Sequence, residues 1–287
     1  MIELTADGGP VAEPRDAATV VLLRDADVGR FEVLMMRRHA RSGFMANAHV
    51  FPGGALDDAD AEPAILARVD GRSADEAASL LGEDDPARAL ALHVAAARET
   101  FEEAGVLLAS NAADLASDAM DDARARLNDG GSFLAILEEL GASITADALA
   151  PWSRWVTPTR EKRRYDARFF LARAPSAQRA AHDDRELVSS AWWTPEDALA
   201  RYASSEIQLP PPTIRTLEEL VELESIDAAF ARARSRTPRP IQPHLAEADG
   251  ALVLTLPGDP LHPVAERRVM GTSRFALVDG RFVGRDP

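Results

Sequence analysis

The sequence predicts a mixed α/β fold, and two observations support this class. Strand-like and helix-like segments follow one another in mixed order, which fits α/β or α+β better than an all-α fold. No internal repeat is visible along the chain. The 287 residues suffice for one large domain or two small ones, and 46% hydrophobic with 28% charged residues is ordinary for a globular chain with a sizeable core.

The net charge and the amino-acid composition exclude several classes of function. The net charge of −15 argues against a general binder of nucleic acid or of anionic membranes, but it allows a small anionic substrate held by a metal ion and local arginines. There is no cysteine, so disulfides and thiol nucleophiles are excluded and a reducing, cytoplasmic location is expected. No run approaches 18 apolar residues, so we expect no membrane association. P-loop, H-E-x-x-H and G-x-S-x-G motifs are absent from the sequence.

The N-terminal part reads as a tail followed by a hairpin. Residues 1–14 are polar and are expected to be flexible. Apolar residues fill 17–23 and 31–36, and a turn at 25–29 joins these two predicted strands.

A basic loop follows the hairpin. Its Arg38 and Arg41 are either solvated charges or contacts to phosphate, and Phe44 either plugs the core or contacts a ligand. The next apolar segment ends at Gly53 and Gly54, a turn that lets backbone approach a metal or phosphate closely.

Residues 55–85 do not resemble a low-complexity linker. An acidic stretch opens this segment, the run 63–69 reads as a short helix, and Ser73 to Glu76 has the capping-box form S-x-x-E before a second helix. The acidic stretch is either an exposed loop or the source of a metal ligand. We expect a small helical cap beside the functional site, where it could select substrates.

A long Ala-rich helix is predicted over 90–108. Pro86 and the acidic residues before it suit the first turn, and Gly105 suits a C-cap, where a positive φ is easily adopted.

Three glutamates on this helix carry the predicted chemistry. Glu99, Glu102 and Glu103 are spaced i, i+3 and i+4, so they share one face with Cβ atoms about 5–6 Å apart. Like charges repel there unless a cation joins them, and several hard oxygen ligands suit Mg²⁺ or Mn²⁺. The alternative is a solvated acidic face. The adjacent Arg98 favours the metal interpretation because it can steady the carboxylates.

The middle of the chain continues the mixed pattern. Two helical segments are expected within 117–140, and strands at 151–157 and 165–172. The loop between these strands is basic, and its Arg160 and Arg163 either contact phosphate or belong to a solvated turn.

The C-terminal part adds further elements to the main domain and then an extension. The predicted order is a strand at 189–194, a helix at 195–202, a helix at 214–232, a Pro-rich connector at 235–243, a strand at 251–256 and a hairpin at 273–284. We assign 15–234 to the main domain. The extension, 235–287, is too short to be an independent domain and is expected to pack on the main body or on a partner subunit, which makes a homodimer a candidate.

The motif around the glutamates resembles a known family. R-E-x-x-E-E-x-G with an upstream Gly-Gly is similar to the Nudix box of Nudix hydrolases, written G-x5-E-x7-R-E-U-x-E-E-x-G-U with U apolar. Thr100 stands at an apolar position of this pattern. About 30 residues are inserted between Gly54 and Arg98, and counting back from the arginine places the first Glu of the box at Leu90, where it is missing. The interrupted box is similar to the branch that includes peroxisomal coenzyme A diphosphatases.

The resemblance implies a fold and a metal site. The fold would be a Nudix-type α/β/α sandwich with a mixed sheet, a helical insertion within the box and a C-terminal β extension. Glu99, Glu102 and Glu103 would bind Mg²⁺ or Mn²⁺ with the backbone of Gly54 nearby, and Glu99 would be a ligand, the base or both. Arg98 would orient a glutamate rather than touch substrate.

The resemblance also implies substrate contacts. Nudix enzymes often place one more carboxylate on a loop opposite the box helix, and Glu186 or Asp183 is best placed for it by chain order. The candidate substrate-binding residues are Arg38, Arg41, Phe44, Gly53, Arg160 and Arg163.

The implied function is hydrolysis of the diphosphate in a nucleoside diphosphate linked to another group. The resemblance favours coenzyme A or acyl-CoA as this small-molecule substrate. ADP-ribose or a nucleotide sugar is the alternative within the same class. A catalytically silent nucleotide-binding regulator is the alternative from a different class.

Overall fold

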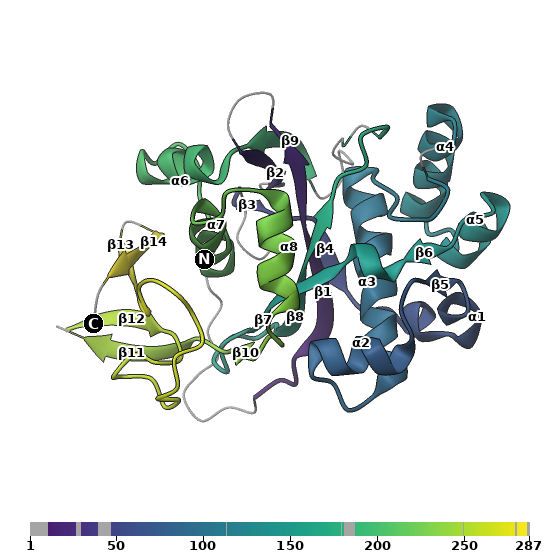
Figure 1. Cartoon of the computed structure of the whole chain (residues 1–287). Helices are drawn as coiled ribbons and strands as arrows, with labels where there is room; N and C mark the ends of the chain where they lie inside the picture. Colours follow the sequence, from purple (N-terminus) through teal and green to yellow (C-terminus); the bar gives the residue numbers. More distant parts are fainter. Residues whose placement is uncertain are drawn as a thin grey trace.

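A mixed eight-stranded sheet forms the centre of the protein. The computed structural model describes residues 11–26, 30–39, 47–112, 114–178, 180, 187–248, 250–278 and 280–285. The strand order is β10-β7-β8-β1-β2-β3, with β4 also paired to β1 and β9 to β2. The strands are β1 Arg15–Asp25, β2 Phe31–Arg38, β3 His49–Val50, β4 Gly53–Ala55, β7 Ala150–Val156, β8 Tyr165–Arg173, β9 Leu187–Trp193 and β10 Pro240–Ile241. Helices lie on both faces of the sheet (Figure 1), which confirms the predicted α/β/α sandwich.

Helix α3 (Pro86–Ala104) covers one face of the sheet. Its start is as predicted, because Asp85 accepts hydrogen bonds from the N–H groups of Ala87 and Arg88 at 3.0 and 3.2 Å. The helix ends at Ala104 rather than at residue 108, since Gly105 takes a left-handed conformation with φ of 69°.

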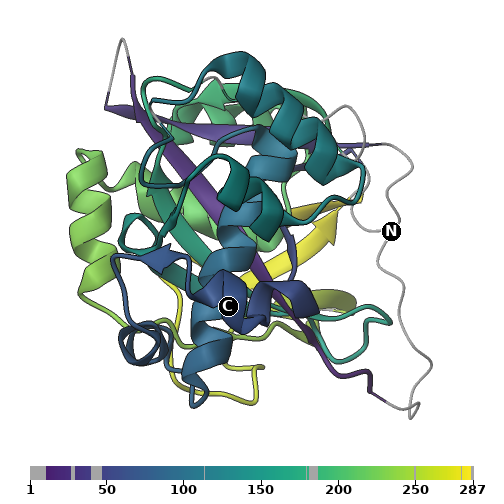
Figure 2. The same cartoon turned by 90° about the vertical axis from the view of Figure 1, so that its right-hand side faces the viewer.

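The insertion and two further helices surround α3, as Figure 2 shows. The predicted helix over 63–69 is a single turn, and residues 69 and 70 pair instead with the strand β6. The second insertion helix begins after Ser73 with the predicted capping box. The elements are η1 Asp58–Ala61, α1 Pro63–Leu66, β5 Val69–Asp70, α2 Ala74–Leu81, α4 Ser117–Asn128, α5 Phe133–Glu139, β6 Ile144–Thr145 and η2 Ala146–Ala148.

The opposite face is covered by α6 (Pro195–Ala203), α7 (Pro211–Val221) and α8 (Ile226–Arg234). The single helix predicted over 214–232 is wrong, because the chain breaks between α7 and α8. Ser225 leaves the helical geometry and caps α8 by accepting a hydrogen bond from the N–H of Ala228 at 3.1 Å. Within the described ranges, no helix combines the length and apolar character that crossing a bilayer requires.

The C-terminal extension is a second, antiparallel sheet. Its strands are β11 His244–Ala248, β12 Ala251–Thr255, β13 Arg274–Val278 and β14 Arg281–Arg285. Leu254 and Phe275 of this sheet belong to the same buried cluster as Leu217 of α7. The buried Arg215 of α7 donates to Thr272 Oγ1 at 2.9 Å and to the carbonyl of Met270 at 3.3 Å. These contacts join the extension to α7.

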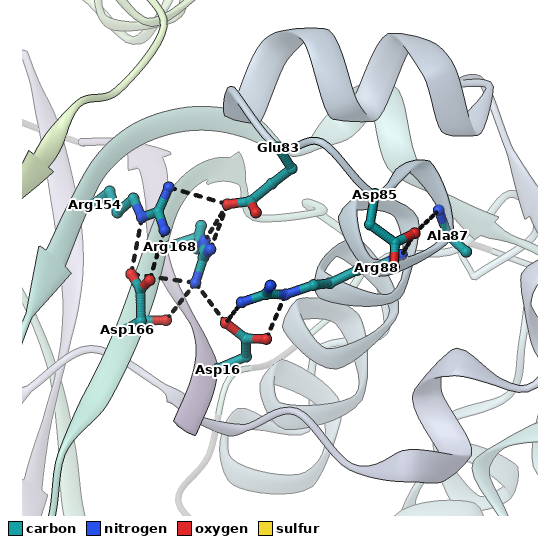
Figure 3. Close-up of polar contacts among 8 residues, drawn as sticks. All are labelled: Asp16, Glu83, Asp85, Ala87, Arg88, Arg154, Asp166 and Arg168. Carbon is teal, nitrogen blue, oxygen red and sulfur yellow. Dashed lines mark hydrogen bonds and ion pairs between the residues drawn. The ribbon is translucent and has the colours of Figure 1, made fainter. Parts of the chain in front are cut away.

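A buried ion network ties α3 to the sheet (Figure 3). Arg168 of β8 is 1% exposed and pairs with Asp16, Glu83 and Asp166. Arg88 of α3 donates two hydrogen bonds of 2.6 Å to the same Asp16. The network fixes α3, which carries the three glutamates, against β1 and β8.

Candidate active site

A cavity of about 750 Å³ lies where α3, the main sheet and the C-terminal sheet meet. It is lined by strands of the main sheet, the last turns of α3, the loop between β7 and β8, Pro210 with the start of α7, and the C-terminal extension, together with Asp57 and Asn128. Glu99, Glu102 and Glu103 all reach this cavity. The structure therefore brings the three predicted glutamates to the wall of one cavity.

The backbone of β4 lies directly against these carboxylates. The N–H of Gly53 donates to Glu103 Oε2 at 2.7 Å, so this amide is engaged by the protein itself. At Gly54, a Cβ atom would lie 2.5 Å from Glu99 Oε1, so only glycine leaves room for that carboxylate. The Gly-Gly pair thus lies in close contact with two of the three glutamates.

Arg98 is held entirely by protein groups. Its Nη1 donates to Glu99 Oε1 at 2.8 Å and to Glu102 Oε2 at 3.2 Å, and its Nη2 also donates to the carbonyl of Ala55 at 2.9 Å. Its Nε and Nη2 bind the two oxygens of Asp60, both at 2.8 Å. This geometry suits a residue that orients glutamates and does not touch substrate.

Asp60 corrects two expectations from the sequence. Its side chain is 1% exposed, so this part of the acidic stretch is not a solvated loop. Counting back from Arg98 puts the first glutamate position of the Nudix box at Leu90. Counting forward from Gly54 through the G-x5-E part of the same pattern reaches residue 60 instead. Asp60 makes the bidentate pair with Arg98, and the inserted residues follow it. The forward count was the signal that would have found it.

The glutamates do not form a ready-made metal cluster. In the part of the chain that the structure describes, no three His, Cys, Asp or Glu side chains are grouped to hold a metal ion. Arg98 holds Glu99 and Glu102, and Gly53 holds Glu103.

The donor set nevertheless fits a hard divalent cation, because three carboxylates face one cavity. Burial raises the pKa of Glu99 to about 7, and Glu102 adds to the rise while Arg98 opposes it. A cation bound there would favour the ionised form.

The predicted substrate-binding residues fall into three groups. Arg38, Gly53 and Arg163 line the cavity, whereas Arg160 is not among its lining residues. Arg38 Nε is buried and has no hydrogen-bond partner among the described residues, and the pairing of β2 with β9 shifts register between Arg37 and Arg38. The remaining candidates lie outside the described residues: Arg41, Phe44, Asp183 and Glu186.

Two kinds of cavity residue were not anticipated. Glu161, in the basic loop between β7 and β8, is buried, and burial raises its pKa to about 7 while Arg164 partly opposes this. An acid among four basic residues was a signal for it. Leu254 and Phe282 come from the C-terminal extension, and no local pattern indicates that they reach the site.

The fold has a counterpart of known structure. The crystal structure of a NUDIX hydrolase from Alicyclobacillus acidocaldarius superposes with a TM-score of 0.63 at 31% identity, over 79% of this chain and 97% of that chain. The sandwich, together with the R-E-x-x-E-E-x-G helix beside a Gly-Gly strand, defines a Nudix hydrolase.

The sequence comparisons identify a family within the Nudix hydrolases. The NUDT19 Nudix domain matches residues 72–220, just over half of the chain. Acyl-coenzyme A diphosphatase NUDT19 of Gallus gallus is 32% identical, over 87% of this chain and 80% of the relative. The Xenopus laevis protein of the same name is 30% identical, over 81% of this chain and 72% of the relative. The chain belongs to the NUDT19 family of Nudix hydrolases, a class of enzymes that in general use divalent metal ions and act on small nucleotide substrates.

Proposed function

We propose that the protein is a metal-dependent diphosphatase acting on acyl-coenzyme A and coenzyme A. The observation that carries this proposal is the trio Glu99, Glu102 and Glu103 at one cavity, in a chain about a third identical to acyl-coenzyme A diphosphatases. The cavity volume of about 750 Å³ falls in the usual range for small-molecule sites.

The reaction is attack of water on one phosphorus of the diphosphate. The bond from that phosphorus to the bridging oxygen breaks, and the bridging oxygen leaves on the second phosphate. The products are a 3′-phosphorylated adenosine nucleotide and acyl-phosphopantetheine. A carboxylate of α3 accepts the proton that the water loses, and we assign Glu99 as both this base and a metal ligand.

We assign the metal site to the three glutamates, with Gly54 backbone nearby and either Mg²⁺ or Mn²⁺ as the ion. A bound divalent ion supplies neutralisation of phosphate charge and a lower pKa of water. Arg98 is a positioning residue, because it binds Glu99 and Glu102 and is itself held by Asp60.

Two arginines are assigned to the phosphates. Arg38 offers a buried donor without a partner among the described residues, and Arg163 is an exposed cation on the cavity wall. Guanidinium groups bind phosphate oxygens with charge-assisted hydrogen bonds.

The test is product release from a panel of substrates with Mg²⁺, with Mn²⁺ and with EDTA. The panel is coenzyme A, an acyl-CoA, ADP-ribose, NADH and a diadenosine polyphosphate. We expect metal-dependent cleavage of the two coenzyme A substrates above the others. Preferred cleavage of ADP-ribose would keep the mechanism and reject the substrate class. Cleavage of no member would contradict the proposal and favour the regulator.

Two variants test whether activity depends on the cavity glutamates in particular or on any glutamate of the protein. Glu102→Gln combined with Glu103→Gln should lower kcat/KM by about a thousandfold or more, because two of the carboxylates that would hold the metal ion are lost, and with the ion goes the positive charge that stabilises the transition state. Glu138→Gln on α5, an exposed glutamate outside the cavity, is the matched control and should retain activity. Full activity of the double variant would refute the metal-site assignment.

A further inference from the structure

The cavity floor runs across the main sheet from the carboxylates to the C-terminal extension. Ala55, Ala17, Ala167 and Trp155 lie opposite one another on the neighbouring strands β4, β1, β8 and β7. All four line the cavity. Three strand spacings separate the first from the last, a span of about 14 Å.

The two ends of this floor differ in chemistry. At β4 stand the Gly-Gly backbone and the carboxylates of α3. Beyond β7 lies β10, which pairs with Trp155 through Ile241 and leads directly into the C-terminal sheet. Figure 1 shows β11 and β12 beside β10 and β7, on the side of the main sheet that faces α7.

The wall that the C-terminal sheet contributes at the far end is apolar, while the rest of the cavity also has polar lining residues such as Thr157, Tyr165 and Thr213. Leu254 and Phe282 of the C-terminal sheet line the far end together with Trp155. Pro243 and the three prolines at 210–212 also line the cavity, and proline has no N–H to offer. A base edge or a sugar would leave its polar groups unpaired against such a wall, at a cost in free energy. A hydrocarbon chain has no polar groups to satisfy.

We propose that the C-terminal sheet is part of the active site and forms the subsite for the acyl chain of an acyl-CoA. Leu254 and Phe282 are then specificity-determining residues, and the extension sets the chain-length preference of the enzyme. This inference rests on the proposed function, since it takes an acyl-CoA as substrate.

Packing contacts hold the wall formed by Leu254 and Phe282 in place, so its shape can discriminate between acyl chains. Phe282 packs edge-to-face on Phe275, with ring centroids 6.4 Å apart, and Phe275 is fully buried. The guanidinium of Arg215 lies 4.9 Å from the ring of Phe275 and binds the segment before β13. These contacts join the wall to α7 of the main body.

The test uses two substitutions with opposite effects on cavity depth. Leu254→Phe fills the apolar end and Phe282→Leu deepens it. The measured quantity is the ratio of kcat/KM for decanoyl-CoA to that for coenzyme A, with hexanoyl-CoA between them. We expect Leu254→Phe to lower this ratio about tenfold, the usual effect of a methylene-sized change in an apolar pocket. We expect Phe282→Leu to keep or raise the ratio for the longest chain.

Val283→Ala is the matched control, because Val283 is the next residue on β14, is 38% exposed and does not line the cavity. This variant should leave the ratio unchanged. An equal loss for all three substrates in Leu254→Phe would overturn the proposal and assign the residue to packing. Thermal melts of each variant identify any loss of folding.

A second measurement needs no variant and no turnover. In EDTA, titration calorimetry of the wild-type protein should give a Kd for decanoyl-CoA at least tenfold below that for coenzyme A, with a negative heat-capacity change from apolar burial. Equal affinities would overturn the acyl subsite. Cleavage of coenzyme A by the same protein tests the proposed function separately, so either statement can fail while the other stands.

Discussion

At the scale of single residues, the site depends on two glycines with different tasks. Gly54 leaves space for the Glu99 carboxylate, whereas a Cβ at Gly53 would meet the backbone oxygen of Ala18 at 2.3 Å. A side-chain end can move aside cheaply and a strand backbone cannot. Gly54 therefore makes room for a carboxylate of the site, whereas Gly53 is required by the packing of β4 on β1, although its N–H also binds Glu103.

We predict that Gly54→Ala keeps the fold but loses activity. The new methyl group displaces the Glu99 carboxylate, and a misplacement of about 1 Å costs roughly a hundredfold in rate. Steady-state kinetics should show the loss in kcat with a raised apparent Kd for Mg²⁺, at a nearly unchanged melting temperature. Gly53→Ala should instead lower the melting temperature by several degrees. Similar effects of the two variants on stability would contradict this division.

Asp60 gives a second residue-scale prediction. Asp60→Ala leaves the buried Arg98 without its bidentate partner, and breaking a buried ion pair costs about 3–5 kcal/mol. Asp58→Ala, at an exposed position two residues away, is the control and should change stability by less than about 0.5 kcal/mol. Urea unfolding measures both. Equal stabilities would show that Arg98 is held without Asp60.

At the scale of elements, α3 carries a buried histidine with a consequence for pH. His93 is fully buried, and burial lowers its pKa to about 4, although its Nδ1 lies 2.9 Å from the carbonyl oxygen of Ala89. The unfolded chain, with a histidine pKa near 6.5, takes up a proton that the folded state refuses. Stability is therefore lost as pH falls from about 6.5 towards 4.

We predict that His93→Leu removes this acid sensitivity. The difference in unfolding free energy between wild type and variant should change by about 2–3 kcal/mol from pH 7.5 to pH 4.5, in favour of the variant at low pH. The comparison is made as a difference because Glu99 and Glu161, whose pKa values are raised, act with the opposite sign in both proteins. Parallel pH profiles would refute the assignment to His93.

Elements set by neighbouring residues were predictable from the sequence. The start of α3 and its end at Gly105 follow from local capping, so these signals could be read from the chain. The break between α7 and α8 was missed because apolar spacing continues through it, and a lone Ser225 is a weak signal. The Asp60–Arg98 pair spans 38 positions, so helix or strand periodicity could not predict it, and only the spacing forward from Gly54 pointed to residue 60.

At the scale of the whole molecule, the two sheets share one core. Leu254, Phe275 and Phe282 of the extension belong to the same buried cluster as Trp155 and Leu217 of the main body. Burial of an apolar side chain contributes roughly 1.5–3 kcal/mol to the free energy of unfolding. Separating the two sheets would expose several such side chains at once and lose each of these contributions. The boundary near residue 235 is a change of sheet, and we infer that it does not divide two folding units.

We therefore predict that the full chain unfolds in one cooperative transition. The four tryptophans lie on β7 and β9 of the main sheet and report on it through fluorescence, whereas far-ultraviolet circular dichroism reports on all elements, so both signals should give the same midpoint in urea. Arg215→Ala should shift that midpoint down without splitting the transition, because it removes the hydrogen bonds from α7 to the segment before β13. An early transition seen by circular dichroism alone would show that the extension unfolds separately. The acyl subsite would then depend on docking of the extension, and the preference for long chains should vanish at the urea concentration of that first transition.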